Sequence, residues 1–357
     1  MPLEVELPTH LSPVELDRKL ARGFFRSGPI LFRADFLHPD EVLRELVHLR
    51  VRLDVESQSK SRARLLRRNR ARFRTTIRDA RVDDERNRLY RQTRERFLGF
   101  VASELDVIVL GEYPGVFDTR EVCVWDGDHL AAVGYFDMGR RAVASILGLH
   151  DPAYARHSLG IYTMLEEMEF AREQGARWYY PGYVIPGLPG FDYKLRLGPV
   201  QFLDGQGRWR ERLQAPKATP AADYAVSRLS AMEAALEARR IPTQRRLYPA
   251  FWLGHVRISG LPFARGMWHL RCSDIRGRRF VVEHLPHEDS FIAAEVRTVP
   301  DLDAFELFEA NPAMEVHCER SALTYVEVIK EHSSIELVVQ TLIDHVQTKR
   351  ASGTQGL

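Results

Sequence analysis

The sequence has little cysteine and no long apolar run. Its 357 residues include three cysteines, Cys123, Cys272 and Cys318, which are widely spaced and form no Cys-x-x-Cys pair. This spacing argues against a disulfide framework and against a cysteine-based zinc or iron–sulfur site. We therefore expect three buried, small hydrophobic side chains, and we assign no metal. No stretch reaches the roughly 18 apolar residues of a membrane span.

The N-terminus also lacks a targeting signal. Met1–Thr9 carries Glu4 and Glu6 and has neither the basic start nor the apolar run of a signal peptide. We expect a cytoplasmic protein that does not contact a membrane. The composition, 45% hydrophobic and 28% charged, excludes collagen, a coiled-coil rod and wholesale disorder. The length predicts two or three domains with a sizeable core.

Positive charge is concentrated in one segment. The formal net charge is +2, but Lys60–Arg96 holds 15 basic residues against 5 acidic ones, a net of +10. Residues 59–72 read as a helix, on which the arginines at 64, 67, 68 and 72 share a broad face. Arginine favours bidentate phosphate contacts, so the segment indicates binding to a nucleic-acid backbone. The alternative is a solvated helix whose charges pair with acids elsewhere.

The clearest pattern of elements lies in residues 121–185. Strands are expected at 121–126, 130–137, 142–149 and 177–180, with a helix from the predicted N-cap Ser158 to residue 174. This is the element order of the GNAT acyltransferase core, where a helix N-terminus faces the donor's phosphates. Arg156–Tyr162 does not fit the usual CoA-binding loop, because Arg156 is one residue too far from Gly160 and Tyr162 is bulky.

We therefore predict an α/β (α+β) protein with a GNAT-like core. A basic helical N-terminal region occupies residues 1–110 and the core residues 111–210. A linker and helix follow at 211–245, and an accessory α+β region of unknown role at 246–357. Further elements are expected as helices at 13–21, 83–105, 223–240 and 334–348, strands within 24–33 and 73–78, and β structure at 245–300.

Residues 130–209 also contain short motifs in a fixed order. They are Ala131–Asp137, the Asp-Pro pair at 151–152, Ser158–Tyr162, Trp178–Ile185, the Tyr-Lys pair at 193–194, Pro199 and Trp209. With this spacing, the segment resembles the C-terminal domain of the arginyl-tRNA–protein transferase and leucyl-tRNA–protein transferase family. Upstream, Gly23–Gly28 and Ser59–Asn69 resemble that family's Gly-Phe-Arg-Arg-Ser-Gly motif and its basic stretch. The resemblance covers about residues 18–210.

The sequence departs from the family in several places. The family's N-terminal cysteine cluster is missing, since the region after the Arg-Ser-Gly strand reads Ala34–Pro39 without cysteine. Leu188–Asp192 replaces a segment that usually carries methionine and cysteine, and Gln201 stands where a glutamate is expected. Residues 211–357 have no counterpart. These changes affect the expected acceptor more than the aminoacyl-tRNA-dependent chemistry.

The resemblance implies transfer of an aminoacyl group from tRNA to a primary amine, with aminoacyl-tRNA as co-substrate and no other cofactor. Positioning and oxyanion stabilisation should supply most of the rate. Lys194 is expected to bind the terminal ribose or phosphate, or to polarise the ester. Tyr193 is expected to hydrogen-bond the oxyanion or act as an acid, and Asp192 to orient the amine. The structural alternatives are a strand-end tyrosine, a solvated lysine and a loop carboxylate.

The remaining expected site residues would bind aminoacyl-tRNA. They are Arg62, Arg64, Arg67 and Arg68 on the acceptor stem, Ser158, Gly160 and Tyr162 at the 3′ end, and Asp151, Tyr180 and Tyr183 in the aminoacyl pocket. Stacking would be the role of the tyrosines, and Asp151 would read a cationic side chain. Plain N-capping, an aromatic core and a turn-forming aspartate are the alternatives.

The predicted function is therefore aminoacyl transfer, of the arginine or leucine class, to an amine of a protein, peptide or small molecule. Two alternatives stay open. One is a CoA-dependent N-acyltransferase of the same fold, which the unsuitable loop disfavours. The other is a non-catalytic RNA- or protein-binding module on a transferase scaffold, which the missing cysteines and the extra region favour.

Overall fold

The computed structural model describes residues 3–37, 44–54, 59–97, 101–109, 115–212, 221–256, 260–272, 277–303, 308–309 and 317–352. Internal contacts divide the chain into two compact units. The N-terminal unit comprises Glu6–Leu37 and Arg44–Ala215, and the C-terminal unit comprises Pro216–Leu357 with Met1–Val5 and His38–Leu43. The four-segment division made from the sequence stays a prediction.

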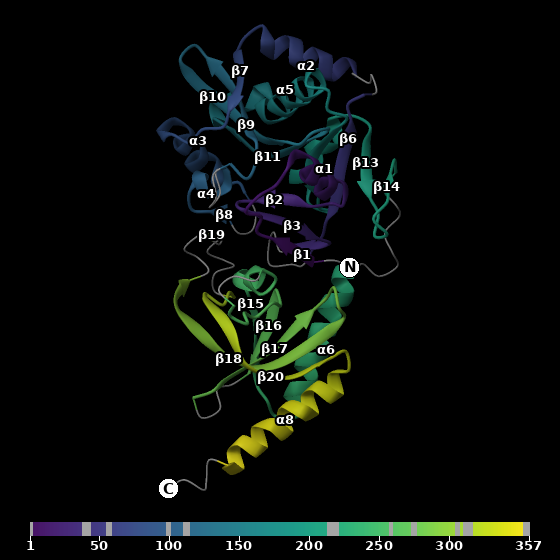
Figure 1. Ribbon diagram of the computed structural model, residues 1–357, viewed down its shortest axis with the longest axis vertical. Coiled ribbons are helices and arrows are strands. Elements are labelled where there is room, and N and C mark those ends of the chain that lie inside the picture. The colour runs from purple at the N-terminus through teal and green to yellow at the C-terminus, as the bar shows by residue number, and fades with distance from the viewer. Residues whose placement is uncertain are drawn as a thin grey trace. The chain divides into compact units, whose positions relative to one another are not determined.

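An eight-stranded sheet forms the centre of the N-terminal unit, in the order β14-β13-β6-β12-β11-β10-β9-β7 (Figure 1). The strands are β6 (Val47–Arg52), β7 (Arg74–Asp79), β9 (Thr119–Asp126), β10 (His129–Met138), β11 (Ala142–His150), β12 (Trp178–Val184), β13 (Val200–Leu203) and β14 (Trp209–Arg210). The strands β9, β10 and β11 run antiparallel, and β12 returns parallel to β11 after helix α5 (Leu159–Glu173). This order confirms the GNAT-like core.

The two parallel strands are paired only at their beginnings. Ala142–Ala144 of β11 pairs with Trp178–Tyr180 of β12. Beyond that point β11 continues its pairing with β10, whereas Gly182–Val184 of β12 pairs with β6. We call the opening between Ser145–His150 and Pro181–Val184 the fork.

Apolar side chains on both faces of this sheet fix its position. The helix α5 packs on one face, where Val143 and Tyr179 join its core. The helix α1 (Pro13–Ala21) lies on the other face, and its Leu16 and Leu20 contact Ala144 among other residues. A reciprocal pair of hydrogen bonds between Ser12 and Glu15 caps α1 at the predicted start. Successive residues of β11 therefore face opposite layers, as strand geometry requires.

Smaller elements surround this sheet. They are β2 (Phe25–Ser27), β3 (Ile30–Ala34), β4 (Phe36–Leu37), β5 (Arg44–Glu45), α2 (Lys60–Arg70), α3 (Asp84–Arg94), β8 (Val101–Ala102), α4 (Leu105–Val109), and the 3-10 helices η1 (Pro152–His157) and η2 (Pro189–Arg196). The strand β1 (Leu3–Glu6) lies at the division between the two units. The helix predicted over 83–105 is too long: α3 ends at its cap Glu95, and β8 and the start of α4 occupy residues at the end of that range.

The C-terminal unit is built on a five-stranded sheet in the order β15-β16-β17-β18-β20. Its strands are β15 (Thr243–Leu247), β16 (Trp268–Cys272), β17 (Arg279–Leu285), β18 (Ser290–Asp303) and β20 (Ser321–His332), and β19 (Phe308–Glu309) is separate. The helix α8 (Ile335–Ser352) packs on β18 and β20 and on α6 (Ala221–Ala238), while η3 (Pro249–Gly254) joins the core of the other face. The predicted helices and β-rich stretch are confirmed.

The structure also shows how the cysteines lie and whether a described helix could span a membrane. All three cysteines are buried, as expected. Among the described helices, none is long and apolar enough to cross a membrane.

Candidate functional site

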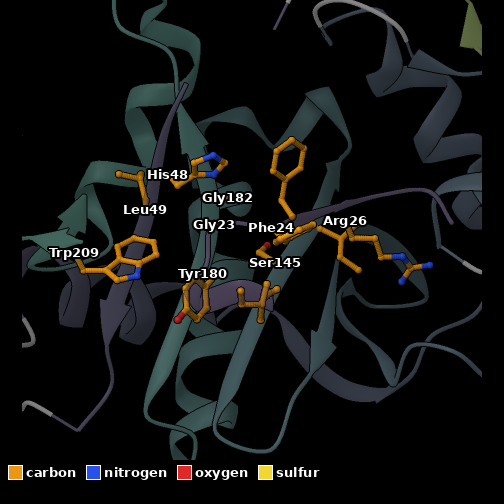
Figure 2. A pocket seen from close by; sticks show the side chains of 13 residues that line it. Gly23, Phe24, Arg26, His48, Leu49, Ser145, Tyr180, Gly182 and Trp209 are labelled. Carbon is orange, nitrogen blue, oxygen red and sulfur yellow. The ribbon is translucent and has the colours of Figure 1, made fainter. Parts of the chain in front are cut away.

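A pocket opens at the fork between β11 and β12 (Figure 2). Its walls come from α1, β2, β6, β11, β12 and β14 and are mostly apolar or aromatic: Leu20, Phe24, Phe25, Leu49, Ala144, Ile146, Tyr180 and Trp209. The remaining polar side chains are Arg26, His48 and Ser145. None of the described lining residues is acidic. Such walls suit an apolar ligand group better than a cationic one.

Two of those three polar side chains are held by the protein itself. The ring Nε2 of His48 lies 3.1 Å from the carbonyl oxygen of Ala34. Burial lowers the pKa of His48 to about 4, so the ring is neutral at pH 7 and its Nε2–H donates to that carbonyl. The Arg26 guanidinium forms a buried ion pair with Asp137, at 2.9 Å. Ser145, the first residue of β11 past the paired stretch, supplies a hydroxyl to the fork.

The carboxyl group of Glu167, on helix α5, lies next to Ser145 of the fork. Glu167 is 1% exposed, and the Tyr179 hydroxyl donates to its Oε2 at 2.7 Å. The Ser145 side chain is its second hydrogen-bond partner. A Cβ atom at Gly134 would lie 2.6 Å from Glu167 Oε1, so this position of β10 has room only for glycine. Burial raises the pKa of Glu167 to about 8, and the group is mostly protonated at pH 7.

Neither Glu167 nor Ser145 was identified from the sequence. A signal was available for Glu167, because it follows Met164 by three residues and precedes Ala171 by four. These spacings place all three on one face of α5, and all three are buried. A carboxylate within a buried helical stripe is rare unless it has a partner or a function.

The Lys194 ammonium lies at the other side of the fork. Its Nζ donates to the carbonyl oxygen of Tyr183 at 3.0 Å and lies 5.0 and 5.3 Å from the ring centres of Tyr183 and Phe191. A Cβ at Gly182 would be 3.4 Å from this Nζ. No carboxylate of the described residues forms an ion pair with Lys194. Burial lowers the pKa of Lys194 to about 8.

The structure brings several expected residues to the fork with Lys194. Tyr183 stacks on Phe191 at a ring distance of 5.7 Å, and Tyr180 lines the pocket beside Trp209. Tyr193 is 37% exposed, and burial of its hydroxyl together with the nearby charge of Glu167 raises its pKa to about 12. Asp192 is exposed at the surface of η2.

Other expected residues lie at the start of α5 instead. Ser158 is not the predicted side-chain N-cap: it has φ +53°, and its side chain makes no capping bond, because the chain reverses there between η1 and α5. Gly160 faces open space. Tyr162 is fully buried, with its hydroxyl 2.8 Å from that of Thr75, so its ring belongs to the core and not to the pocket. Asp151 caps η1 and contacts His129 at 2.9 Å.

The basic helix α2 packs against α5 (Figure 1). Arg64, Arg67 and Arg68 are exposed, whereas Arg62 is buried and donates to the carbonyl oxygen of Leu197 just after η2. At the other end of α2, Asn69 donates to the carbonyl oxygen of His157 at 3.0 Å, and Arg68 does so at 3.3 Å. The exposed arginines therefore occupy a helix that links the η2 side of the fork with the η1–α5 junction.

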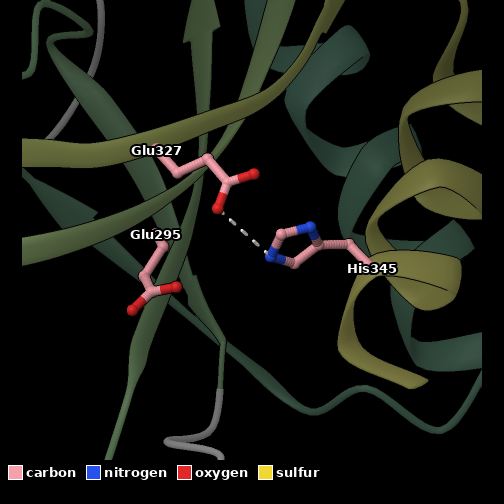
Figure 3. Close-up of side chains that lie close together, drawn as sticks. All are labelled: Glu295, Glu327 and His345. Atoms are coloured by element: carbon pink, nitrogen blue, oxygen red, sulfur yellow. Dashed lines mark ion pairs between the residues drawn. The ribbon is translucent and has the colours of Figure 1, made fainter. Parts of the chain in front are cut away.

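Among its described residues, the C-terminal unit brings together three side chains with metal-ligand chemistry (Figure 3). Glu295 and Glu327 are direct cross-strand partners on β18 and β20, and His345 of α8 lies 3.9 Å from Glu327. Arg278 donates to both oxygens of Glu295, at 3.3 and 3.1 Å. The Glu295 carboxylate therefore already has a cationic partner, and we assign no metal here.

Comparisons with known proteins match much of the N-terminal unit. Residues 72–204 match the family described as arginine-tRNA-protein transferase, C terminus. The chain is 28% identical over 214 residues to an aspartate/glutamate leucyltransferase of Leptospira interrogans, covering 57% of this chain and 81% of that protein. A relative of the same name from Xylella fastidiosa is 29% identical over 204 residues, 54% of this chain and 76% of the other.

One solved structure is also similar in part. It is the C-terminal domain of a putative lysylphosphatidylglycerol synthetase from Agrobacterium fabrum, with 14% identity, a TM-score of 0.31, and coverage of 49% of this chain and 53% of that one.

The GNAT-like core and the sequence relatives identify an aminoacyl-tRNA-dependent aminoacyltransferase. Residues 72–204 match the C-terminal domain of the arginine-tRNA-protein transferase family, and the relatives of this region are named leucyltransferases.

Proposed function

We propose that this protein transfers leucine from leucyl-tRNA to a primary amine of a protein or peptide, forming an amide bond and releasing tRNA. The observation that carries the proposal is the Lys194 ammonium, which lies at the fork without a carboxylate partner among the described residues. A cation held in such a partly desolvated site stabilises the negative charge that develops on the ester oxygen. The apolar pocket without acidic lining favours a leucyl over an arginyl side chain, and the names of the relatives support leucine.

The expected site residues then divide into two groups. At the fork, Lys194 polarises the ester, Tyr193 donates from a neutral hydroxyl, and Asp192 orients the incoming amine. Tyr180 and Tyr183 line the aminoacyl pocket. On the tRNA side, Arg64, Arg67 and Arg68 contact acceptor-stem phosphates, and the backbone at Ser158 and Gly160 faces the 3′ end. Arg62 positions α2 through the Leu197 carbonyl.

The acceptor is best sought among acidic N-termini. The relatives are named for aspartate and glutamate, so peptides that begin with these residues are the first acceptors to test. Because this chain lacks the family's cysteine cluster, other protein, peptide and small-molecule amines belong in the same series. Charged tRNA as the donor leads us to expect that the protein acts in the cytoplasm.

A transfer assay tests the proposal. The protein is incubated with tRNA charged with labelled leucine or arginine, and with peptides that begin with Asp, Glu or Ala or with a whole lysate as acceptors. We expect leucine to enter amide linkage and arginine to be transferred at least tenfold less well. Acetyl transfer from acetyl-CoA without use of tRNA would instead assign a CoA-dependent acyltransferase. Tight tRNA binding without transfer to any acceptor would assign a binding module.

The role of α2 is tested by reversing two exposed charges. The double variant Arg64→Glu/Arg68→Glu should weaken tRNA binding at least tenfold at low salt, because each lost phosphate contact removes counterion release. The slope of log Kd against log salt should flatten by about two. Filter binding over a salt series measures both effects. The matched control is Arg239→Glu/Arg240→Glu, which reverses two exposed charges at the end of α6 and should leave the slope unchanged. An unchanged slope in the α2 variant would contradict the assignment.

A further inference from the structure

Glu167 is a buried acid that the fold itself does not require. Its hydrogen-bond partners, Tyr179 and Ser145, are both hydroxyl-bearing side chains, and no cation among the described residues pairs with it. Along α5, its buried neighbours one turn away are Thr163, Met164 and Ala171, and none of them carries a charge that would pair with a carboxylate. An unpaired buried carboxyl group destabilises the folded state, which makes a functional reason for its presence the stronger explanation.

Ser145 connects this acid to the pocket. It is hydrogen-bonded to Glu167 below the sheet, and it also lines the pocket at the fork. The connection is possible because β11 and β12 are no longer paired at this residue. Gly134 on the neighbouring strand leaves room for the Glu167 carboxyl, which a Cβ atom would displace. A proton can therefore pass between the pocket and Glu167 through a single group, the Ser145 hydroxyl.

We propose that Glu167, acting through the hydroxyl of Ser145, takes a proton from the acceptor ammonium at the fork and returns it to the departing 3′-oxygen of tRNA. The inference rests on the transfer reaction proposed above. The free amine attacks the ester carbonyl, a C–N bond forms, and the C–O bond to the ribose breaks. A second proton leaves the nitrogen for solvent, and the products are the amide and tRNA with a free 3′-hydroxyl.

The proton affinity of Glu167 suits this role. An α-ammonium has a pKa of about 7.7–8.0, and an acid–base group works best when its pKa is close to that of its partner and to the working pH. Burial raises the pKa of Glu167 to about 8. An ordinary surface glutamate, several units more acidic, would hold the proton too weakly.

The test uses the variants Glu167→Gln and Ser145→Ala in the full-length protein with leucyl-tRNA. Each should lower kcat by about 100-fold or more, with KM for leucyl-tRNA changed less than twofold, because general acid–base catalysis contributes about 10²–10⁴-fold. The control Glu169→Gln changes a carboxylate on the partly exposed side of the same helix and should leave kcat within twofold. Melting curves verify folding of each variant.

A pH profile separates this role from a structural one. The acceptor is a peptide with an aminooxy group at its N-terminus, whose nitrogen is neutral near pH 8. Glu167 then takes the proton that this nitrogen loses as it attacks the ester, and the rising limb belongs to the enzyme. The wild-type rate should rise as the pH approaches 8, before loss of the Lys194 charge lowers it at higher pH, and Glu167→Gln should lose the rising limb. If Glu167→Gln transfers at the wild-type rate and keeps the rise toward pH 8, the inference about Glu167 is wrong, but the proposed function stands. Failure of the wild-type protein to transfer from any charged tRNA would overturn the proposed function and this inference with it.

Discussion

Replacing Lys194 with alanine should lower kcat for aminoacyl transfer by about 10²–10³-fold while tRNA binding stays within twofold of the wild-type value. A single donor to a developing oxyanion contributes rate enhancement of this size. Its contribution appears in kcat and not in binding, because the charge on the ester oxygen exists only in the transition state. The Nζ atom lies at the fork against Gly182, where the ester is proposed to lie.

The same lysine should set the alkaline limb of the pH profile. Burial lowers the pKa of Lys194 to about 8, below the usual value for lysine, so the group loses its charge as the pH rises through 8. Only the protonated form stabilises an oxyanion, and the rate should therefore fall above pH 8. Lys194→Arg keeps the charge at all these pH values and should abolish the falling limb, although the larger guanidinium also changes the geometry.

A neighbouring arginine supplies the control for Lys194. Arg196 lies two residues further along η2 and is exposed, so Arg196→Ala should leave both kcat and the pH profile unchanged. Stopped single-turnover transfer from leucyl-tRNA measures the chemical step directly. Full activity of Lys194→Ala, with an intact alkaline limb, would remove Lys194 from the chemistry.

The core of the fold was predictable from the sequence because its signals are local. Alternating apolar residues mark β9 and β10, and the turn between them contains Gly127, whose φ of +62° matches the hairpin expected there. Gly175 similarly ends α5 at the predicted place. Lys194 and Tyr193 were identified through a motif, and the structure places both at the fork.

The pocket was not predictable, because its walls come from segments that only long-range pairing brings together. His48 reaches the fork because β6 inserts between β12 and β13, an arrangement that no local pattern reveals. Ser145 lies in the middle of the single strand predicted over 142–149, so the end of its pairing with β12 leaves no mark in the sequence. The end of α3 was also misjudged, since neither glycine nor proline follows Glu95 closely to mark it.

Arg26 of the Gly23–Gly28 motif forms a buried ion pair with Asp137, and its loss should strongly destabilise the folded protein. Arg26 is almost fully buried, and its guanidinium donates to Asp137 at 2.9 Å, to the carbonyl oxygens of Gly28 and Val109 at 2.7 and 2.8 Å, and to Thr119 at 2.9 Å. Asp137 has no exposed surface, and its only other partner among the described side chains is Thr119. The pair thus anchors β2 to the end of β10.

Arg26→Met should destabilise the folded protein by about 3–5 kcal/mol at pH 7, because it leaves the Asp137 carboxylate buried without a cation. Burial raises the pKa of Asp137 even in the wild-type protein, and Arg26 is the main group that opposes this rise. Without Arg26 the folded-state pKa rises further above the unfolded value. The deficit of Arg26→Met should therefore be largest at pH 8 and should shrink as the pH falls toward 5 and the carboxyl takes up a proton.

Urea unfolding of the full-length protein at pH 5 and pH 8 measures this deficit. The double variant Arg26→Met/Asp137→Leu should recover much of the loss, since replacing both members of a buried pair removes the unpaired charge. A deficit that is equal at both pH values, or no recovery in the double variant, would show that packing of the Arg26 side chain dominates. Arg26 and Asp137 belong to two motifs of the family resemblance that lie 111 residues apart in sequence. Their ion pair gives a physical reason why the two motifs occur together in this chain. It fixes β2, which lines the pocket, to β10, the strand that also carries Gly134 beside Glu167.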